Sequence, residues 1–158
     1  MKFDIETLEA DLLALVKLKL PAKIAEITAE KADSIALDVP GNSQYFNSTD
    51  DEVDNRKLSV QYGIIENDPV SISSNTAENG SYIFLVYLSE INNKPGILRK
   101  KLFRYIRALK EVFEENFDRF PCASNMKITT IAPQSWRENE MSPVYKVGGI
   151  YIKTSIAG

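Results

Sequence analysis

The strongest constraint on the fold of this chain is a run of seven consecutive apolar residues, Tyr82–Leu88. A strand that is apolar at every position is normally covered on both faces, whereas a half-exposed strand alternates apolar and polar residues. A membrane-spanning helix needs about 20 apolar residues, so this run is far too short to cross a bilayer. We therefore predict that Tyr82–Leu88 is the central strand of a sheet and that both of its faces are covered.

The segment Ile97–Phe117 predicts a long amphipathic helix with an unusual order of charges. Its apolar residues recur at steps of three and four, which places them on one face of a helix. The opposite face is basic first and acidic later, although the partly positive N-terminus of a helix favours acidic residues by roughly 0.3–1 kcal/mol per group. The charged residues of this face are Lys100, Arg104, Arg107, Glu111 and Glu114.

This charged face is the first candidate functional site, and three interpretations of it are open. A solvated surface is the commonest meaning of such a run of charges, and a contact with a protein partner is the second. Contact with the phosphates of a nucleic acid is the third, because Lys and Arg make most such contacts. Phe103 and Tyr105 flank the basic residues, but at helical spacing we expect them in a core or an interface and not stacked on bases.

The remaining pattern predicts a shorter helical region and several further strands. Apolar residues from Ile5 to Leu15 line an N-terminal helix capped by Asp4, and Pro21 is expected to break it before a second short helix that fades near Asp33. The pair Gly148-Gly149 indicates a bulge or a close backbone approach in the last strand. Strands are predicted over Ile35–Val39, Leu58–Ile65, Val70–Ser74, Met126–Ile131 and Tyr145–Ile156, with turns at Asn67–Pro69 and Glu78–Gly80 and a polar loop over Pro133–Pro143 that contains Trp136.

Together these elements predict one α+β domain over residues 1–158, with two main helices packed on a mostly antiparallel sheet of about four to six strands. Gly41–Arg56 is expected to be a long mobile loop. It carries the second candidate site, an acidic cluster of Asp50, Asp51, Glu52 and Asp54. Their spacing does not match a calcium-binding loop, so a solvated loop, or a contact with the basic helix face of a neighbouring copy, is the preferred interpretation over a metal site.

The composition removes most catalytic chemistry. The chain has no histidine, which is the commonest general base and metal ligand, so its one cysteine, Cys122, has no histidine to activate it. No glycine-rich phosphate loop is present either. We therefore predict that the protein is not an enzyme and uses no metal or cofactor. The net charge of −3 argues against general nucleic-acid binding, although a local basic patch can still bind it.

The N-terminal segment does not look like a secretory signal. Acidic residues interrupt it at Asp4, Glu6, Glu9 and Asp11. With a single cysteine and no long apolar run, we expect a protein of the reducing cytoplasm that does not enter a membrane.

Four stretches of the sequence occur in an order that a known family shares. Leu20-Pro21-Ala22-Lys23 closes the N-terminal helix, and the apolar strand Tyr82–Leu88 follows. Arg104-Tyr105-Ile106-Arg107-Ala108-Leu109 lies in the long helix, and Val144–Ile152, with the sequence VYKVGGIYI, lies near the end. Together these stretches resemble the small minor tail proteins of tailed bacteriophages, in particular the tail-terminator or tail-completion group at the head–tail junction.

The resemblance implies an α+β structural protein, without catalytic residues, that assembles into a homo-oligomeric ring, commonly of six copies. Such a ring caps the tail, so the implied partners are further copies of the chain, the tail tube protein and the head connector. The implied location is the virion, after synthesis in the cytoplasm of the bacterial host. The charged face of the long helix would then lie at a subunit boundary, or face the lumen and contact passing DNA.

Two other functions remain open on the sequence alone. A small adaptor or chaperone-like binding protein would form a stable complex with one partner and no ring. A nucleic-acid-binding protein would use the basic residues between Lys100 and Arg107, and its affinity would fall steeply with salt.

Overall fold

A computed structural model of the chain describes residues 5–47, 57–72, 75–89, 94–116, 123–137, 139–141 and 144–157. Within these residues two α-helices and five strands form an α+β fold, as predicted. In chain order the elements are α1 (Ile5–Lys31), the short 3-10 helix η1 (Asn42–Gln44), β1 (Tyr45–Asn47), β2 (Leu58–Ile72), β3 (Asn75–Ser89), α2 (Pro95–Glu114), β4 (Ala123–Trp136) and β5 (Tyr145–Ala157).

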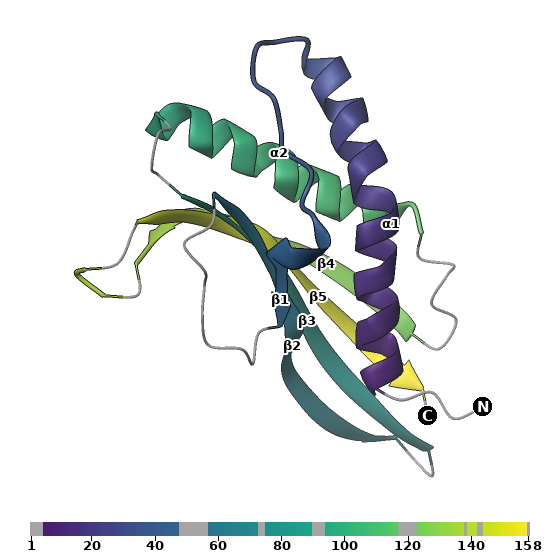
Figure 1. Ribbon diagram of the computed structural model, residues 1–158. Coiled ribbons are helices and arrows are strands. Elements are labelled where there is room, and N and C mark those ends of the chain that lie inside the picture. The colour runs from purple at the N-terminus through teal and green to yellow at the C-terminus, as the bar shows by residue number, and fades with distance from the viewer. Residues whose placement is uncertain are drawn as a thin grey trace.

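The five described strands form one sheet in the order β1-β2-β3-β5-β4. β1 runs parallel to β2, and all other neighbouring pairs are antiparallel. Both helices pack on the same face of the sheet, α1 toward the β1–β2 edge and α2 toward β5 and β4 (Figure 1). The side chain of Asn47 in β1 donates a hydrogen bond to Glu9 of α1, and the ring of Phe84 in β3 lies 5.4 Å from that of Phe113 in α2.

The apolar run Tyr82–Leu88 lies in β3, the central strand, as predicted. Its even-numbered residues face the helices, and Val86 is completely buried there. On the opposite face Ile83 and Tyr87 are also buried, while Leu85 is half buried. The helices cover only one face, so the second face is covered mainly by large side chains of the sheet itself.

The prediction that Pro21 breaks the first helix was wrong. α1 is continuous from Ile5 to Lys31 and contains Pro21. A proline inside a helix removes one backbone hydrogen bond and costs about 3 kcal/mol. Buried residues before and after it, Leu20 and Ile24, pack into the same core, so tertiary packing offsets this cost. The helix ends at Lys31, close to the predicted end, and Ala32 follows with a positive φ of 47°.

The predicted turns Asn67–Pro69 and Glu78–Gly80 were also wrong. Both segments lie inside the long antiparallel pair of β2 and β3, where Pro69 pairs with Glu78. A proline is tolerated in this position because β1 pairs with β2 only over Val60–Tyr62, which leaves the outer edge of β2 without a described strand partner farther along. Because β2 and β3 continue through both segments, the end of β2 and the start of β3 project beyond the start of α1 (Figure 1).

Two predictions between residues 34 and 56 need correction. Ile35–Val39 is not a strand, and the described start of the predicted mobile loop is ordered as η1 and β1. Gln44 holds this part in place, because its side chain accepts a hydrogen bond from the backbone N–H of Gly41 and donates one to the carbonyl of Leu58. The acidic cluster from Asp50 to Asp54 lies outside the described residues.

β4 extends farther than the predicted strand Met126–Ile131 and reaches Trp136, so the first part of the predicted loop Pro133–Pro143 is a strand. β5 matches its prediction closely. The predicted bulge is located in β4: Ile131 pairs with Gly149 and the next pair in register joins residues 134 and 147, so two residues of β4 stand opposite Gly148.

The close backbone approach predicted at the two glycines is confirmed. A Cβ atom on Gly149 would lie 1.9 Å from the carbonyl oxygen of Phe84 in the neighbouring strand. A Cβ atom on Gly148 would lie 3.0 Å from the Cδ1 atom of Ile106 in α2. Gly149 thus allows β5 to lie close to β3, and Gly148 allows α2 to pack closely on the sheet.

Candidate functional site

The charged face predicted on the long helix lies against α1 and forms a charged seam between the two helices. The order of charges explains the pairing, because the basic start of α2 meets the acidic end of α1 and the acidic end of α2 meets a lysine in the middle of α1. The charged seam consists of Lys23, Glu26, Glu30 and Asp33 on the α1 side and Arg104, Arg107, Glu111 and Glu115 on the α2 side.

Arg104 is, together with Lys23, the most buried cation of the charged seam. Its guanidinium donates hydrogen bonds to both carboxylate oxygens of Asp33, and the distance from Nη1 to Oδ1 is 2.9 Å. The side chain of Arg104 is only 8% exposed, whereas that of Asp33 is 39% exposed. The hydrogen bonds from Arg104 lower the pKa of Asp33 from 3.8 to about 2, with a smaller contribution from the charge of Lys100.

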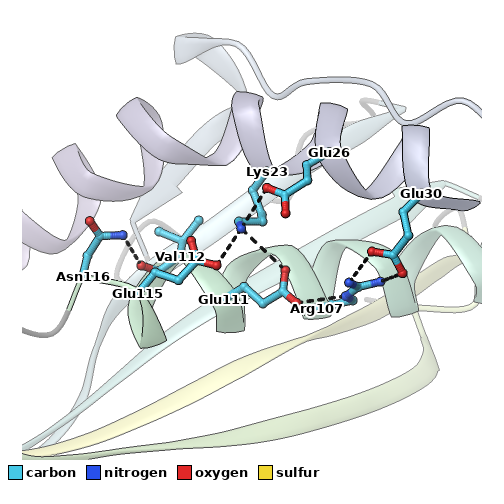
Figure 2. Close-up of polar contacts among 8 residues, drawn as sticks. All are labelled: Lys23, Glu26, Glu30, Arg107, Glu111, Val112, Glu115 and Asn116. Carbon is cyan, nitrogen blue, oxygen red and sulfur yellow. Dashed lines mark hydrogen bonds and ion pairs between the residues drawn. The ribbon is translucent and has the colours of Figure 1, made fainter.

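Arg107 joins the two helices at the next position along the charged seam. Its guanidinium donates two hydrogen bonds to Glu30 of α1, at 2.9 and 2.6 Å, and one to Glu111 of α2 at 3.0 Å. Hydrogen bonding to Arg107 lowers the pKa of Glu30, and hydrogen bonding to Glu30 and then Glu111 raises the pKa of Arg107. Figure 2 shows Arg107 between these two carboxylates.

Lys23 closes the other end of the charged seam. Its side chain is 8% exposed, and its Nζ atom lies 2.8 Å from Glu115, 3.0 Å from Glu26 and 3.8 Å from Glu111 (Figure 2). The hydrogen bond to Glu115 raises the pKa of Lys23, and the bond to Glu26 adds to this effect. Asn116 ends the helix nearby, because its side chain donates a hydrogen bond to the carbonyl of Val112 at 2.7 Å.

These contacts change the interpretation of the predicted site residues. Arg104, Arg107 and Glu111 already have partners within the chain, and a purely solvated face is the wrong interpretation for Arg104, whose side chain is buried. Lys100 and Glu114 are exposed, and Glu114 lies 3.6 Å from Lys110 on the same helix. A sequence signal for the charged seam existed on the α1 side, where Lys23 precedes Glu26 and Glu30 in the helix and Asp33 just after it, an order that matches the charges of α2 when the helices run in opposite directions.

The charged seam is built to hold charges in place. Its carboxylates Glu30 and Asp33 have lowered pKa values and its cations Lys23, Arg104 and Arg107 have raised ones. A general acid or base at neutral pH needs the opposite shifts, which bring its pKa toward 7. The arrangement therefore favours a fixed angle and register of the two helices and does not favour proton transfer.

We expect the contribution of Asp33 to stability to disappear in acid. Because its pKa is lower in the folded chain than in the unfolded chain, its stabilising effect is fully present above about pH 4 and is lost as the pH falls toward 2. The difference in free energy of unfolding between the wild type and Asp33→Asn should therefore shrink between pH 5 and pH 2, as measured by urea titration at each pH. When Arg104→Gln is added to both proteins, the difference should no longer depend on pH. If the difference between the wild type and Asp33→Asn stays constant from pH 5 to pH 2, Arg104 does not stabilise the charged form of Asp33.

The outer face of α1 is the first surface feature that the sequence analysis missed. Leu18 is 64% exposed, although it lies in the middle of the helix. Its neighbours along the outer face carry no charge for four turns, in contrast to the solvated face of most surface helices. The exposed residues of this outer face around Leu18 are Ala14, Ala22, Ala25 and Ala29.

A cluster of aromatic rings on the sheet face opposite the helices is the second missed feature. Tyr87 of β3 lies at its centre, with ring centroids 5.6 Å from Trp136, 5.8 Å from Phe46 and 6.3 Å from Tyr145. The Tyr87 hydroxyl donates a hydrogen bond to the side chain of Gln61 at 2.7 Å. Four different strands contribute the four rings, so their proximity depends on the strand order and could not be read from the sequence.

A basic surface at the start of α2 is the third surface feature that the sequence did not reveal. Arg99 and Lys100 are exposed, Lys101 is half buried, and the guanidinium carbon of Arg99 lies 5.1 Å from the ring centroid of the exposed Phe103. Beside it lies an open cavity of about 230 Å³, lined by Gly96, Arg99, Pro133 and Lys146.

Within the described part of the chain, no group of three or more His, Cys, Asp or Glu side chains is placed to hold a metal ion. Neither described helix is long and apolar enough to cross a lipid bilayer. The chain matches no protein-family model and no curated protein.

Proposed function

We propose that the chain is a structural subunit of a bacteriophage virion, which assembles with further copies of itself into a ring that terminates or completes the tail at the head–tail junction. The resemblance of four stretches to the tail-terminator group supports this proposal. The α+β architecture, with two helices on a mostly antiparallel sheet, agrees with what that resemblance implies. The partners in this role are copies of the chain, the tail tube protein and the head connector.

The observation that carries self-assembly is the apolar outer face of α1. The inner face of α1 is fully buried at residues such as Leu12 and Leu20, and the charged seam lies on the flank of the helix. The outer face of a surface helix is normally polar, so an uncharged outer face around an exposed leucine is unusual. None of the residues that the structure describes covers Leu18, which is 64% exposed, or the surrounding alanines, and such a surface is typical of one that another protein covers.

The small side chains make a close contact with another surface possible. Alanine allows backbones to approach, and the single large residue Leu18 can act as the anchor that fills a hollow on the partner. A ring of identical subunits needs such a surface on every copy, and the contact closes only if the rotation between neighbours closes. Because all subunits of a ring are identical, the contact made by Leu18 of one copy would recur at every subunit interface.

The test is the oligomeric state of the purified chain and of one matched pair of variants. We expect the wild type to form multimers in a concentration-dependent manner by light scattering and analytical ultracentrifugation. Leu18→Glu places a charge in the proposed contact and should raise the dissociation constant by about 100-fold, which corresponds to about 2.7 kcal/mol. Met141→Glu, at a residue that is 94% exposed outside α1, should leave the multimer unchanged.

Three outcomes would count against the proposal. A wild type that stays monomeric at high concentration, even with tail tube protein present, would remove the ring. Multimers that Leu18→Glu does not weaken would remove the role of the α1 face. A stable complex with one foreign partner and no ring would favour the adaptor or chaperone-like function instead.

A further inference from the structure

The start of α2 carries positive charges that the charged seam does not use. We define the basic patch as the four cations Lys94, Arg99, Lys100 and Lys101. Among the residues that the structure describes, no acid forms an ion pair with any of the four. Arg104 is the main cause of the lowered pKa of Asp33, and the charge of Lys100 adds only a smaller contribution. The basic patch therefore keeps most of its charge for something outside the chain.

The position of the basic patch is unfavourable for the isolated helix. The N-terminus of a helix is partly positive, so cations close to it raise the free energy of the fold. The first turn of α2 contains no acidic residue, and Lys94 at the N-cap makes no hydrogen bond with its side chain. A negatively charged partner would relieve this repulsion.

A cavity beside the basic patch brings in positive charge from a second element. This cavity of about 230 Å³ is lined by Arg99 of α2 and by Lys146 of β5. The Nζ atom of Lys146 donates a hydrogen bond to the hydroxyl of Ser135 in β4 at 2.6 Å, which holds this lysine beside the sheet. Pockets for drug-sized ligands measure about 300–1,000 Å³, so this cavity suits a single small anionic group such as phosphate.

The cations of the basic patch extend beyond the cavity, which favours a polyanion over a single ion. Lys94 and Lys101 lie about 10 Å apart along the helix axis, at a rise of 1.5 Å per residue. Duplex DNA carries one negative charge for about every 1.7 Å of its axis, so several phosphates come within reach of a surface of this length. An isolated phosphate ion would leave most of the basic patch without a counter-charge.

The aromatic surface at the basic patch favours contact with a backbone over contact with bases. Phe103 is 46% exposed, and the guanidinium carbon of Arg99 lies over its ring, 5.1 Å from the centroid. This cation–π contact positions Arg99 and covers one face of the ring. Proteins that bind single strands stack successive bases on several exposed rings, but no other aromatic side chain of the described part of α2 is exposed. Phosphates of a duplex therefore fit this surface better than unstacked bases do.

We propose that the basic patch and Lys146 together bind the phosphate backbone of duplex DNA without reading its sequence. One phosphate lies in the cavity between Arg99 and Lys146, and the lysines of the basic patch contact its neighbours. The site differs from the one considered on the sequence alone, because Arg104 and Arg107 are already bound by carboxylates of the chain. All of its residues belong to one copy, so this inference goes beyond the proposed ring and does not depend on it.

The salt dependence of DNA binding tests the site. Fluorescence anisotropy of a labelled 20-base-pair duplex measures the binding constant of the purified chain at several salt concentrations. With about five cations in contact, the logarithm of the binding constant should fall with the logarithm of salt concentration at a slope of about −4 to −5. Arg99→Gln/Lys100→Gln should weaken binding by at least about tenfold at low salt and flatten the slope by about 2, and Lys146→Gln should flatten it by about 1. A duplex of shuffled sequence should bind equally well.

A matched control separates the site from the change in net charge. Lys127 and Lys153 are exposed and pair in register on the face of the sheet that the helices do not cover. Lys127→Gln/Lys153→Gln removes the same number of charges and should leave the slope unchanged. Arg107→Gln should change the slope less than Lys100→Gln does, because the guanidinium of Arg107 already binds two glutamates. Urea unfolding midpoints of the variants should confirm that each one is folded.

The remaining outcomes would overturn the inference. The wild type fails the test if it does not bind duplex DNA at low salt, or if the control pair weakens binding as much as the pair in the basic patch. Tighter binding of a polyglutamate peptide than of a duplex with the same number of charges would make the partner an acidic protein instead. The oligomeric state is measured separately, so a monomeric chain that binds DNA as described contradicts the proposed ring and supports this site, and a ring that does not bind DNA does the reverse.

Discussion

Replacement of Gly149 by alanine is expected to lower the free energy of unfolding by about 3 kcal/mol or more. The added Cβ atom would lie 1.9 Å from the carbonyl oxygen of Phe84 and 2.9 Å from the Cα atom of Leu85, which are both backbone atoms. Rotation of a side chain cannot relieve this overlap, so β5 and β3 have to separate at the centre of the sheet. Urea titration followed by circular dichroism measures the effect.

Two other glycines provide graded controls for this prediction. Gly148→Ala meets the end of the flexible Ile106 side chain at 3.0 Å and a backbone oxygen at 3.2 Å, so a smaller loss is expected. Gly96→Ala has open space around its Cβ atom and lies within α2, where alanine stabilises a helix by up to about 1 kcal/mol relative to glycine. Equal effects at the three positions would show that close packing of β5 is not the cause.

Reversal of Arg104, one of the two most buried charges of the charged seam, should have a similarly large effect. Arg104→Glu puts a carboxylate where the arginine side chain is 8% exposed, directly facing Asp33. An unpaired buried charge typically costs about 3–5 kcal/mol. We therefore expect a loss of about 3 kcal/mol or more in the free energy of unfolding, measured by urea titration at pH 7.

The specificity of this effect can be checked on the same helix. Lys110→Glu changes a half-exposed lysine whose single described ion pair, with Glu114, spans 3.6 Å, and exposed pairs contribute at most about 1 kcal/mol. The reversed pair Arg104→Glu with Asp33→Arg should recover part of the lost stability, because the attraction across the two helices is restored. A loss from Arg104→Glu no larger than that from Lys110→Glu would mean that the charged seam does not hold the helices.

The local patterns that predicted the fold correctly were those with a strong period. The uniformly apolar run Tyr82–Leu88 predicted a central strand, and the spacing of apolar residues in Ile97–Phe117 predicted α2. Two of the predictions that failed depended on single prolines. Pro21 and Pro69 were interpreted as breaks, but packing of the residues around Pro21 and the edge position of Pro69 allow both inside regular elements.

The candidate site was predicted only in part. The unusual charge order of α2 was visible, but not that α1 supplies its partners, because this depends on how two distant segments are placed in space. The exposure of Leu18 was missed for the same reason. The sequence shows that this residue is apolar, but only the packing of α1 on the sheet shows that it lies on the outer face.

The sequence by itself determined the class of the fold and the side chains that are available for chemistry. Periodicity is a local property that specifies helices and strands, and the composition includes no histidine. Only the tertiary structure decided which charges are satisfied within the chain and which remain for a partner. The reason is physical, since an ion pair depends on distances of a few ångströms between residues such as Asp33 and Arg104, 71 positions apart in the chain.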